Sequence, residues 1–232
     1  MPRVLVACVI VVVETAALGI PCILVGLLDR SGRLSHAIVR LWGRLVLGAF
    51  GVRVDVEGAD APSGPAVYAA NHGSALDIPI LFGYLPVDFR IIHKKSLYPV
   101  PVVGWHLFLG GHIPIDRGNP FKARRSLDLA AARIRGGISV AVFPEGTRSA
   151  TDEVRHFKRG SLVLALNAGV PIVPVSLVGV KRVVPHGIST LRPGTVRIRI
   201  HREIPTAGRD AETADRLAEE VRVVVANGCV SA

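Results

Sequence analysis

The chain has 232 residues, enough for one sizeable α/β domain, and half of them are hydrophobic. Its mean hydropathy of +0.43 is high for a freely soluble protein, and its formal net charge of +10 favours anionic partners such as phospholipid surfaces, phosphorylated metabolites or nucleic acid. The three cysteines form no CxxC pair, which excludes a disulfide framework.

The first predicted element is a long apolar helix over residues 4–28, interrupted by Glu14 and Pro21. About 20 apolar residues span a bilayer core, so this stretch is long enough to cross a membrane. It is too long for the apolar part of a cleaved signal peptide, and the other alternative is a buried core helix. If the segment spans, its C-terminal side is cytoplasmic because four arginines follow it: Arg30, Arg33, Arg40 and Arg44.

A second helix is predicted over residues 34–50, where it fits the returning arm of a helical hairpin that enters one leaflet. Its apolar residues lie broadly on one side, while Arg33, Arg40 and Arg44 form a basic strip able to meet lipid phosphates. A single span and a re-entrant hairpin both fit this pattern. In either arrangement, residues 1–50 are expected to be membrane-anchoring helices and residues 51–232 to form one α/β domain.

From residue 52 onward, short apolar runs typical of buried strands alternate with helical stretches. The predicted strands are VRVDVEG (52–58), PAVYAA (65–70), RIIH (90–93), HIPI (112–115), ISVAVF (138–143), VPIVPVSL (170–177) and TVRIRIHREI (195–204). The last alternates apolar and polar residues, which is typical of an edge or one-sided strand. Helices are predicted near 75–84, 120–135, 158–168 and 211–226, with Gly228 ending the last. The pattern predicts an α/β fold with a mostly parallel or mixed sheet flanked by helices.

The stretch NHGSALD (71–77) has two interpretations. In the structural one, Ser74 caps the following helix and Asp77 completes a capping box. In the catalytic one, His72 lies in the loop and Asp77 in the first helical turn, so that the carboxylate binds one imidazole nitrogen. The other nitrogen is then free to accept a proton from a substrate hydroxyl.

Two further loops follow predicted strands, at the position where parallel sheets bind ligands. HIPIDRGNP (112–120) contains Arg117, and FPEGTRS (143–149) contains the run Glu145, Gly146, Thr147 and Arg148. Gly146 permits close backbone approach, and two arginines can grip a phosphate through paired donors. Taken singly, these charges fit solvated or locally paired surface residues equally well. Together with His72 they indicate a site for a phosphorylated substrate.

Four stretches, in order, resemble the motif blocks of the 1-acylglycerol-3-phosphate acyltransferases, within the glycerolipid acyltransferase superfamily. NHGSALD resembles the H-x-x-x-x-D motif, GGHIPIDR (110–117) the second block, FPEGTRS the third and VPIVPVSL the fourth. The resemblance covers roughly residues 50–205, and an N-terminal membrane-embedded helix pair also occurs in the family. It implies direct acyl transfer from acyl-CoA or acyl carrier protein to the sn-2 hydroxyl of 1-acylglycerol-3-phosphate, giving phosphatidic acid with no acyl-enzyme and no cofactor.

The resemblance also implies a role for each matching residue. His72 is the base and Asp77 orients it; Arg117 and the loop from Glu145 to Arg148 hold the acceptor. Lys94, ahead of the second block, adds to the phosphate site. The sequence departs from the family's usual residues at Pro114 and His93, and neither departure removes a chemical group from the site.

Three other functions fit part of the sequence. A non-catalytic phospholipid-binding protein of the same fold predicts loss of His72 or Asp77, and both are present. A metal-dependent phosphate hydrolase needs a ligand cluster, and the other histidines are scattered and unpaired along the chain. A nucleic-acid binder leaves the apolar segment unexplained. Among acceptors, glycerol-3-phosphate, another lysophospholipid and a lyso-ornithine lipid stay open beside lysophosphatidate.

Overall fold

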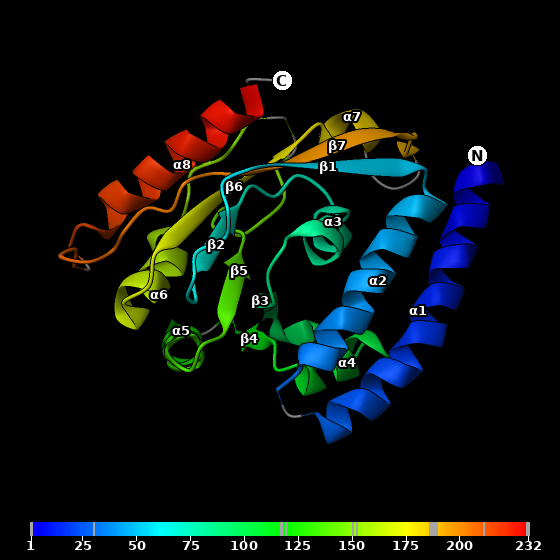
Figure 1. Cartoon of the computed structure of the whole chain (residues 1–232), viewed down its shortest axis with the longest axis horizontal. Helices are drawn as coiled ribbons and strands as arrows, with labels where there is room; N and C mark the ends of the chain where they lie inside the picture. The colour runs from blue at the N-terminus through cyan, green and yellow to red at the C-terminus, as the bar shows by residue number, and fades with distance from the viewer. Residues whose placement is uncertain are drawn as a thin grey trace.

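The computed structural model describes residues 2–29, 31–116, 118, 120–149, 151, 153–185, 190–210 and 212–230. A seven-stranded sheet has the order β1-β7-β6-β2-β5-β3-β4, and every neighbouring pair is parallel except β6 and β7 (Figure 1). The mostly parallel sheet is therefore confirmed. Its strands are β1 (Val52–Gly58), β2 (Val67–Ala70), β3 (Phe89–Lys94), β4 (Ile113–Ile115), β5 (Ser139–Val142), β6 (Ile172–Val178) and β7 (Gly194–Ile200).

Burial explains the two kinds of strand pattern. Every residue of β2, β5 and β6 is buried, which is why these strands are continuous apolar runs. β7 alternates instead, with Val196, Ile198 and Ile200 buried, so it is one-sided as predicted. It is not an edge strand, because it lies between β1 and β6. The edge on that side is β1.

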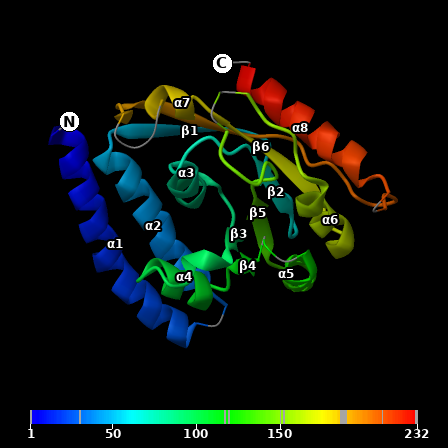
Figure 2. The same cartoon turned by 180° about the vertical axis from the view of Figure 1, so that it is seen from behind.

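Helices cover both faces of the sheet (Figures 1 and 2). One layer contains α1 (Pro2–Leu28), α2 (Arg33–Ala49), α3 (Asp77–Tyr84) and α4 (Val103–Leu109), and the other contains α5 (Pro120–Arg135), α6 (Arg159–Ala168) and α8 (Ala214–Val230). A short α7 (Val180–Val183) follows β6, and a 3₁₀ turn (Lys95–Leu97) follows β3. The sequence patterns did not predict α4, α7 or this turn.

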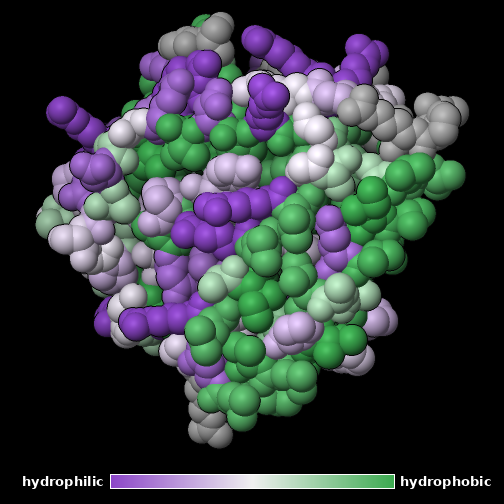
Figure 3. All heavy atoms as spheres, turned by 45° about the vertical axis from the view of Figure 1, so that its right-hand side comes forward, coloured by the Kyte–Doolittle hydropathy of each residue, from purple (hydrophilic) through white to green (hydrophobic). Residues whose placement is uncertain are grey.

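The helices α1 and α2 lie side by side as an antiparallel pair (Figures 1 and 2). Pro21 lies inside α1 without ending it. Trp42 Nε1 donates a hydrogen bond to Thr15 Oγ1 across the pair, at 3.0 Å. Among the described residues, α1 is the one helix long and apolar enough to cross a membrane by length and composition. A band of hydrophobic side chains follows the course of α1 across the surface (Figure 3).

Two predictions from this sequence need a change in detail. Arg40 and Arg44 bind the carbonyl oxygens of Leu85 and Gly83 at the C-terminal end of α3, where a helix attracts cations, while Arg33 and Arg44 stay exposed; the contact of this strip with lipid phosphates stays a prediction. Gly228 does not end α8, which continues to Val230. A glycine is needed there because a side chain at this position would collide with β6 and the residue after β7.

Candidate active site

The loop between β2 and α3 is organised by one buried carboxylate. Asp77 Oδ2 lies 2.7 Å from His72 Nδ1 and accepts hydrogen bonds from the backbone N–H groups of Gly73 (2.8 Å) and Ser74 (2.9 Å). Asp77 is fully buried, whereas the His72 side chain is 16% exposed. An ionised carboxylate only accepts hydrogen bonds, so His72 Nδ1 carries a proton and Nε2 keeps its lone pair.

This geometry confirms the predicted contact between His72 and Asp77 and modifies the capping-box interpretation. Asp77 reaches back to the N–H of Ser74, as the acidic member of a capping box does. Ser74 Oγ accepts from the N–H of Leu76 at 3.2 Å and does not cap Asp77. The same carboxylate therefore fixes the start of α3 and the orientation of the imidazole, and the two interpretations do not exclude each other.

The loop after β5 holds the His72 loop from the other side. Glu145 Oε1 accepts the N–H of His72 at 2.9 Å, and the N–H of Ser149 donates to the His72 carbonyl at 2.7 Å. The ring of Phe143 stacks on the imidazole, with ring centroids 4.1 Å apart. Burial raises the pKa of the Glu145 carboxyl above its usual value. Glu145 thus contacts the backbone of His72, a contact that the sequence did not indicate.

Asn71 connects the same loop to β6. Its side-chain amide donates to the carbonyl of Leu177 at 3.1 Å and accepts the Leu177 N–H at 2.8 Å. Both hydrogen bonds hold the residue before His72 against the strand that carries the fourth motif block. Asn71, Phe143 and Ser149 lie inside the quoted motifs, yet only their three-dimensional contacts reveal what they do.

His72 lies in the wall of a large cavity of about 990 Å³. Most of its lining is apolar and comes from α1, α2, α3, α4 and the strands β3 and β5; examples are Leu18, Ile38, Ile78, Phe82, Ile91 and Leu107. Its polar members include Lys94, Thr147, Arg148 and Lys158. The structure thus brings His72, Lys94 and Arg148 to one cavity, and it adds Lys158, which the motifs did not indicate.

Gly146 has φ of +73°, in the left-handed region that favours glycine. A Cβ there would lie 3.1 Å from Lys158 Nζ, so a side chain would press against this lysine. Arg117, the predicted phosphate ligand of the second block, lies outside the described residues. Pro114 is in the edge strand β4 opposite His93, where a residue without an N–H is tolerated.

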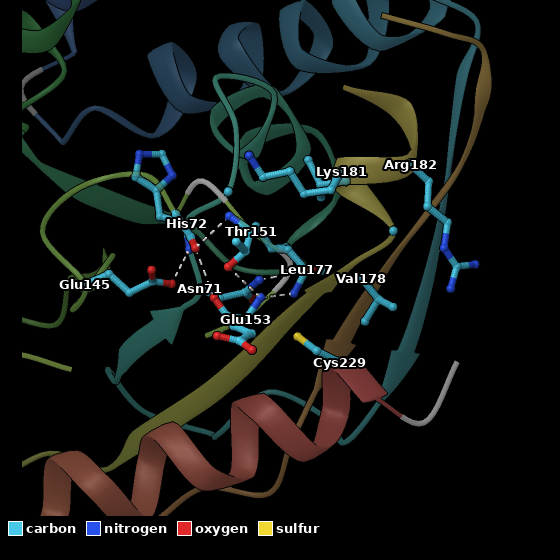
Figure 4. A pocket seen from close by; sticks show the side chains of 14 residues that line it. Asn71, His72, Glu145, Thr151, Glu153, Leu177, Val178, Lys181, Arg182 and Cys229 are labelled. Carbon is cyan, nitrogen blue, oxygen red and sulfur yellow. Dashed lines mark hydrogen bonds between the residues drawn. The ribbon is translucent and has the colours of Figure 1, made fainter. Parts of the chain in front are cut away.

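A second, smaller cavity of about 140 Å³ lies behind the backbone of His72. Its lining is more polar and includes Asn71, Glu145, Glu153 and Lys181 (Figure 4). In Figure 4 the imidazole points away from the other labelled side chains. The free ring nitrogen therefore serves the large apolar cavity and not this one.

Three other residues correct the expectation that the remaining histidines are unpaired. His112 Nδ1 accepts the N–H of Ile91, and His112 Nε2 lies 3.2 Å from His106 Nε2. His106 Nδ1 lies in turn 3.1 Å from Cys22 Sγ on α1. Desolvation lowers the pKa of His106 to about 4 and that of His112 well below its usual value. These contacts between neutral groups hold α1 against α4. No group of three or more metal-ligating side chains occurs within the described part of the chain.

Comparison with known proteins identifies the family. Residues 53–178 match the family described as Acyltransferase, over more than half of the chain. The chain belongs to the acyltransferase family. The matched segment runs from β1 to the end of β6 and includes the His72 loop, the Glu145 loop and the strand that binds Asn71.

Relatives within the acyltransferase family have consistent names. The chain is 36% identical over 204 residues to a 1-acyl-sn-glycerol-3-phosphate acyltransferase of Chlamydomonas reinhardtii, covering 86% of this chain and 60% of that one. A chloroplastic enzyme of the same name from Brassica napus is 34% identical, covering 93% and 64%. The chain thus spans about three fifths of the length of these relatives.

A crystal structure of the 1-acyl-sn-glycerophosphate (LPA) acyltransferase PlsC from Thermotoga maritima matches the fold closely. The TM-score is 0.82 with 28% sequence identity, and the match covers 97% of this chain and 92% of that one. The similarity therefore includes the N-terminal helix pair as well as the sheet.

Proposed function

We propose that the protein is a 1-acyl-sn-glycerol-3-phosphate acyltransferase. It transfers a fatty acyl group from acyl-CoA or acyl carrier protein to the sn-2 hydroxyl of lysophosphatidate. The observation that carries this proposal is the His72–Asp77 pair, whose free imidazole nitrogen serves an apolar cavity with cationic side chains in its wall. The names of the relatives support the same acceptor.

In the proposed reaction, His72 Nε2 takes the proton of the acceptor hydroxyl while the oxygen attacks the thioester carbonyl carbon. The tetrahedral intermediate collapses, the C–S bond breaks, and the imidazolium returns its proton to the departing thiolate. Asp77 keeps Nδ1 protonated and stabilises the imidazolium. General base catalysis of this kind contributes roughly 10²–10⁴-fold, and orienting the two substrates contributes the larger part of the acceleration.

Cationic side chains bind the phosphate of the acceptor in this proposal. Lys94, Arg148 and Lys158 line the cavity together with His72 and supply donors and positive charge. Arg117 keeps its predicted role as a further phosphate ligand, and Gly146 and Thr147 keep theirs as acceptor-binding residues. Glu145 contributes by holding the backbone of His72.

The apolar part of the same cavity accommodates the fatty acyl chain. Its volume of about 990 Å³ and its lining from α1 to α4 suit a long hydrocarbon. The chain of the acyl donor and that of a lysolipid acceptor both fit such a space, so the choice of lysophosphatidate rests on the names of the relatives.

We propose that residues 1–50 anchor the protein to a phospholipid membrane and residues 51–232 form the acyltransferase domain, with the active site on the cytoplasmic side. Exposed apolar residues of α1 support the anchor, among them Val12, Ile20, Leu24 and Leu28. Because α1 packs along α2 in the same layer as α3, a helix lying in the membrane surface fits better than one crossing the bilayer.

The test is acyl transfer from radiolabelled oleoyl-CoA in mixed micelles to a panel of acceptors. Lysophosphatidate, lysophosphatidylcholine, monoacylglycerol and glycerol-3-phosphate separate the contribution of the phosphate from that of the chain. We expect transfer to lysophosphatidate, and we expect Lys158→Gln to raise KM for it about 10-fold, as loss of a charge-assisted hydrogen bond does. Faster transfer to monoacylglycerol would contradict the phosphate assignment, and no transfer to any acceptor would contradict the proposed function.

A further inference from the structure

The segment from Leu97 to Phe108 leads into α4 and forms most of this helix. It has exposed apolar side chains although α4 packs against α1. Trp105 is 57% exposed and Phe108 71%. These residues lie three apart on α4 and therefore share one face. Gly104 and Leu107, beside them on the same helix, are buried. Large aromatic side chains on one face of a short helix indicate an interaction surface.

This surface continues the exposed side of α1. A Cβ on Gly26 of α1 would lie 2.9 Å from Leu109 Cβ, so the glycine allows close contact between the two helices. Val102 packs against Gly19, about two turns before Gly26 on α1. The φ of Val102 is 63°, and the chain turns there so that α4 lies along α1.

The chemistry around the segment fits a phospholipid surface. Lys94 and Lys95, both exposed, lie just before it in the sequence, and the ring of Tyr98 near its start contacts that of Phe108, with centroids 6.2 Å apart. Tryptophan and lysine together are typical of protein segments at the boundary between lipid headgroups and acyl chains. The other side of the same segment lines the large cavity through Leu97, Val103 and Leu107.

We propose that Trp105 and Phe108 insert into a phospholipid bilayer, as a second lipid contact beside α1. Resting on the proposed membrane association and acyl transfer, this contact places the wall of the active-site cavity against the lipid from which a lysolipid acceptor comes. The partner is the bilayer itself, and the aromatic pair determines how efficiently an acceptor embedded in the bilayer reaches His72.

Tryptophan fluorescence tests the contact directly, because the chain has two tryptophans and Trp42→Phe leaves Trp105 alone. The full-length variant, its fold checked by circular dichroism, is bound to phosphatidylcholine–phosphatidylglycerol vesicles with and without brominated acyl chains. We expect bromine near the headgroup end to reduce the Trp105 emission roughly twofold and iodide in the solvent to have little effect.

Two results would overturn the proposal. Iodide quenching that is equal for free and vesicle-bound protein would mean that Trp105 stays in water. Protection from iodide without quenching by brominated lipid would mean that a second copy of the chain covers this face. Vesicle binding through α1 is measured in the same samples by flotation, so a failure of membrane association is seen separately.

Activity provides the second measurement. In the wild-type background, Trp105→Ser/Phe108→Ser is compared with Leu129→Ser/Val223→Ser, which removes two exposed apolar side chains from α5 and α8 on the other face of the sheet. We expect the aromatic double variant to raise KM for lysophosphatidate in vesicles about 10-fold and to keep wild-type rates in mixed micelles. Equal KM values for both double variants in vesicles would overturn the proposal, while absence of transfer by the wild type in micelles would instead overturn the proposed function.

Discussion

At the scale of single residues, one carboxylate oxygen of Asp77 accepts hydrogen bonds from an imidazole and two backbone amides. Three donors compensate for burying the negative charge, which without them would cost several kcal/mol. The amides of Gly73 and Ser74 are used for this purpose and are not free to stabilise an oxyanion. The chemistry at His72 therefore depends on the same atoms that fix the start of α3.

The contact between Glu145 and the N–H of His72 leads to a prediction at this scale. Glu145→Ala leaves a buried N–H without its partner, so we expect a loss of about 1–3 kcal/mol in the free energy of unfolding and a fall in kcat. Glu145→Gln keeps an oxygen acceptor at the same place and should retain most of both. Chemical unfolding and steady-state kinetics of the two variants provide the measurement. If the Gln variant loses as much kcat as the Ala variant, the carboxylate has a direct role at the substrate and is not a positioning residue.

At the scale of elements, the loop after β5 combines a left-handed glycine, Gly146, with a packed lysine, Lys158. Gly146→Ala places a Cβ at φ of +73° and 3.1 Å from Lys158 Nζ. We expect a destabilisation of about 1–2 kcal/mol from the backbone and a higher KM for lysophosphatidate because Lys158 is displaced. Gly169→Ala is the matched control, since Gly169 also has positive φ but no neighbour within 4 Å of a Cβ. A KM increase as large in the control would mean that the effect is not transmitted by Lys158.

Periodicity and strand runs were enough to predict the main elements, because buried strands and amphipathic helices leave strong patterns. α4 and α7 have seven and four residues, too few for a periodic pattern to appear. Gly228 was wrongly predicted to end a helix, because the need for glycine there comes from a long-range contact with Ser176 and His201. The same holds in the site: the motifs indicated His72 and Asp77, but the stacking of Phe143 and the hydrogen bonds of Asn71 join segments far apart in sequence.

At the scale of the whole molecule, α1 and α2 share one hydrophobic core with α3 and the sheet. A series of contacts between neutral groups, from Ile91 through His112 and His106 to Cys22, joins α1 to this core. Neighbouring Arg90 also disfavours protonation of both histidines. The arrangement ties the packing of α1 against α4 to the protonation state of the histidines.

This coupling predicts a pH dependence. Both histidines have folded-state pKa values below the ordinary 6.5, with His106 at about 4, so the unfolded chain binds more protons between these limits. The contribution of these two neutral histidines to the free energy of unfolding is complete above about pH 6.5 and is lost as the pH falls towards about 4. The midpoint of thermal unfolding in detergent should therefore fall across this window, and it should fall less in His106→Leu/His112→Leu. Parallel pH profiles for the two proteins would contradict the assignment.

The central claim is that His72 Nε2 removes the proton of the acceptor hydroxyl. The most direct measurement is the single-turnover rate of acyl transfer from oleoyl-CoA to lysophosphatidate by His72→Gln, alongside equilibrium binding of lysophosphatidate to the same variant. We predict a rate reduced by roughly 10²–10⁴-fold with the Kd changed only a few-fold, because glutamine keeps a polar side chain but provides no base. A rate within about threefold of wild type would contradict the account, since a reaction without this base would then proceed through other groups.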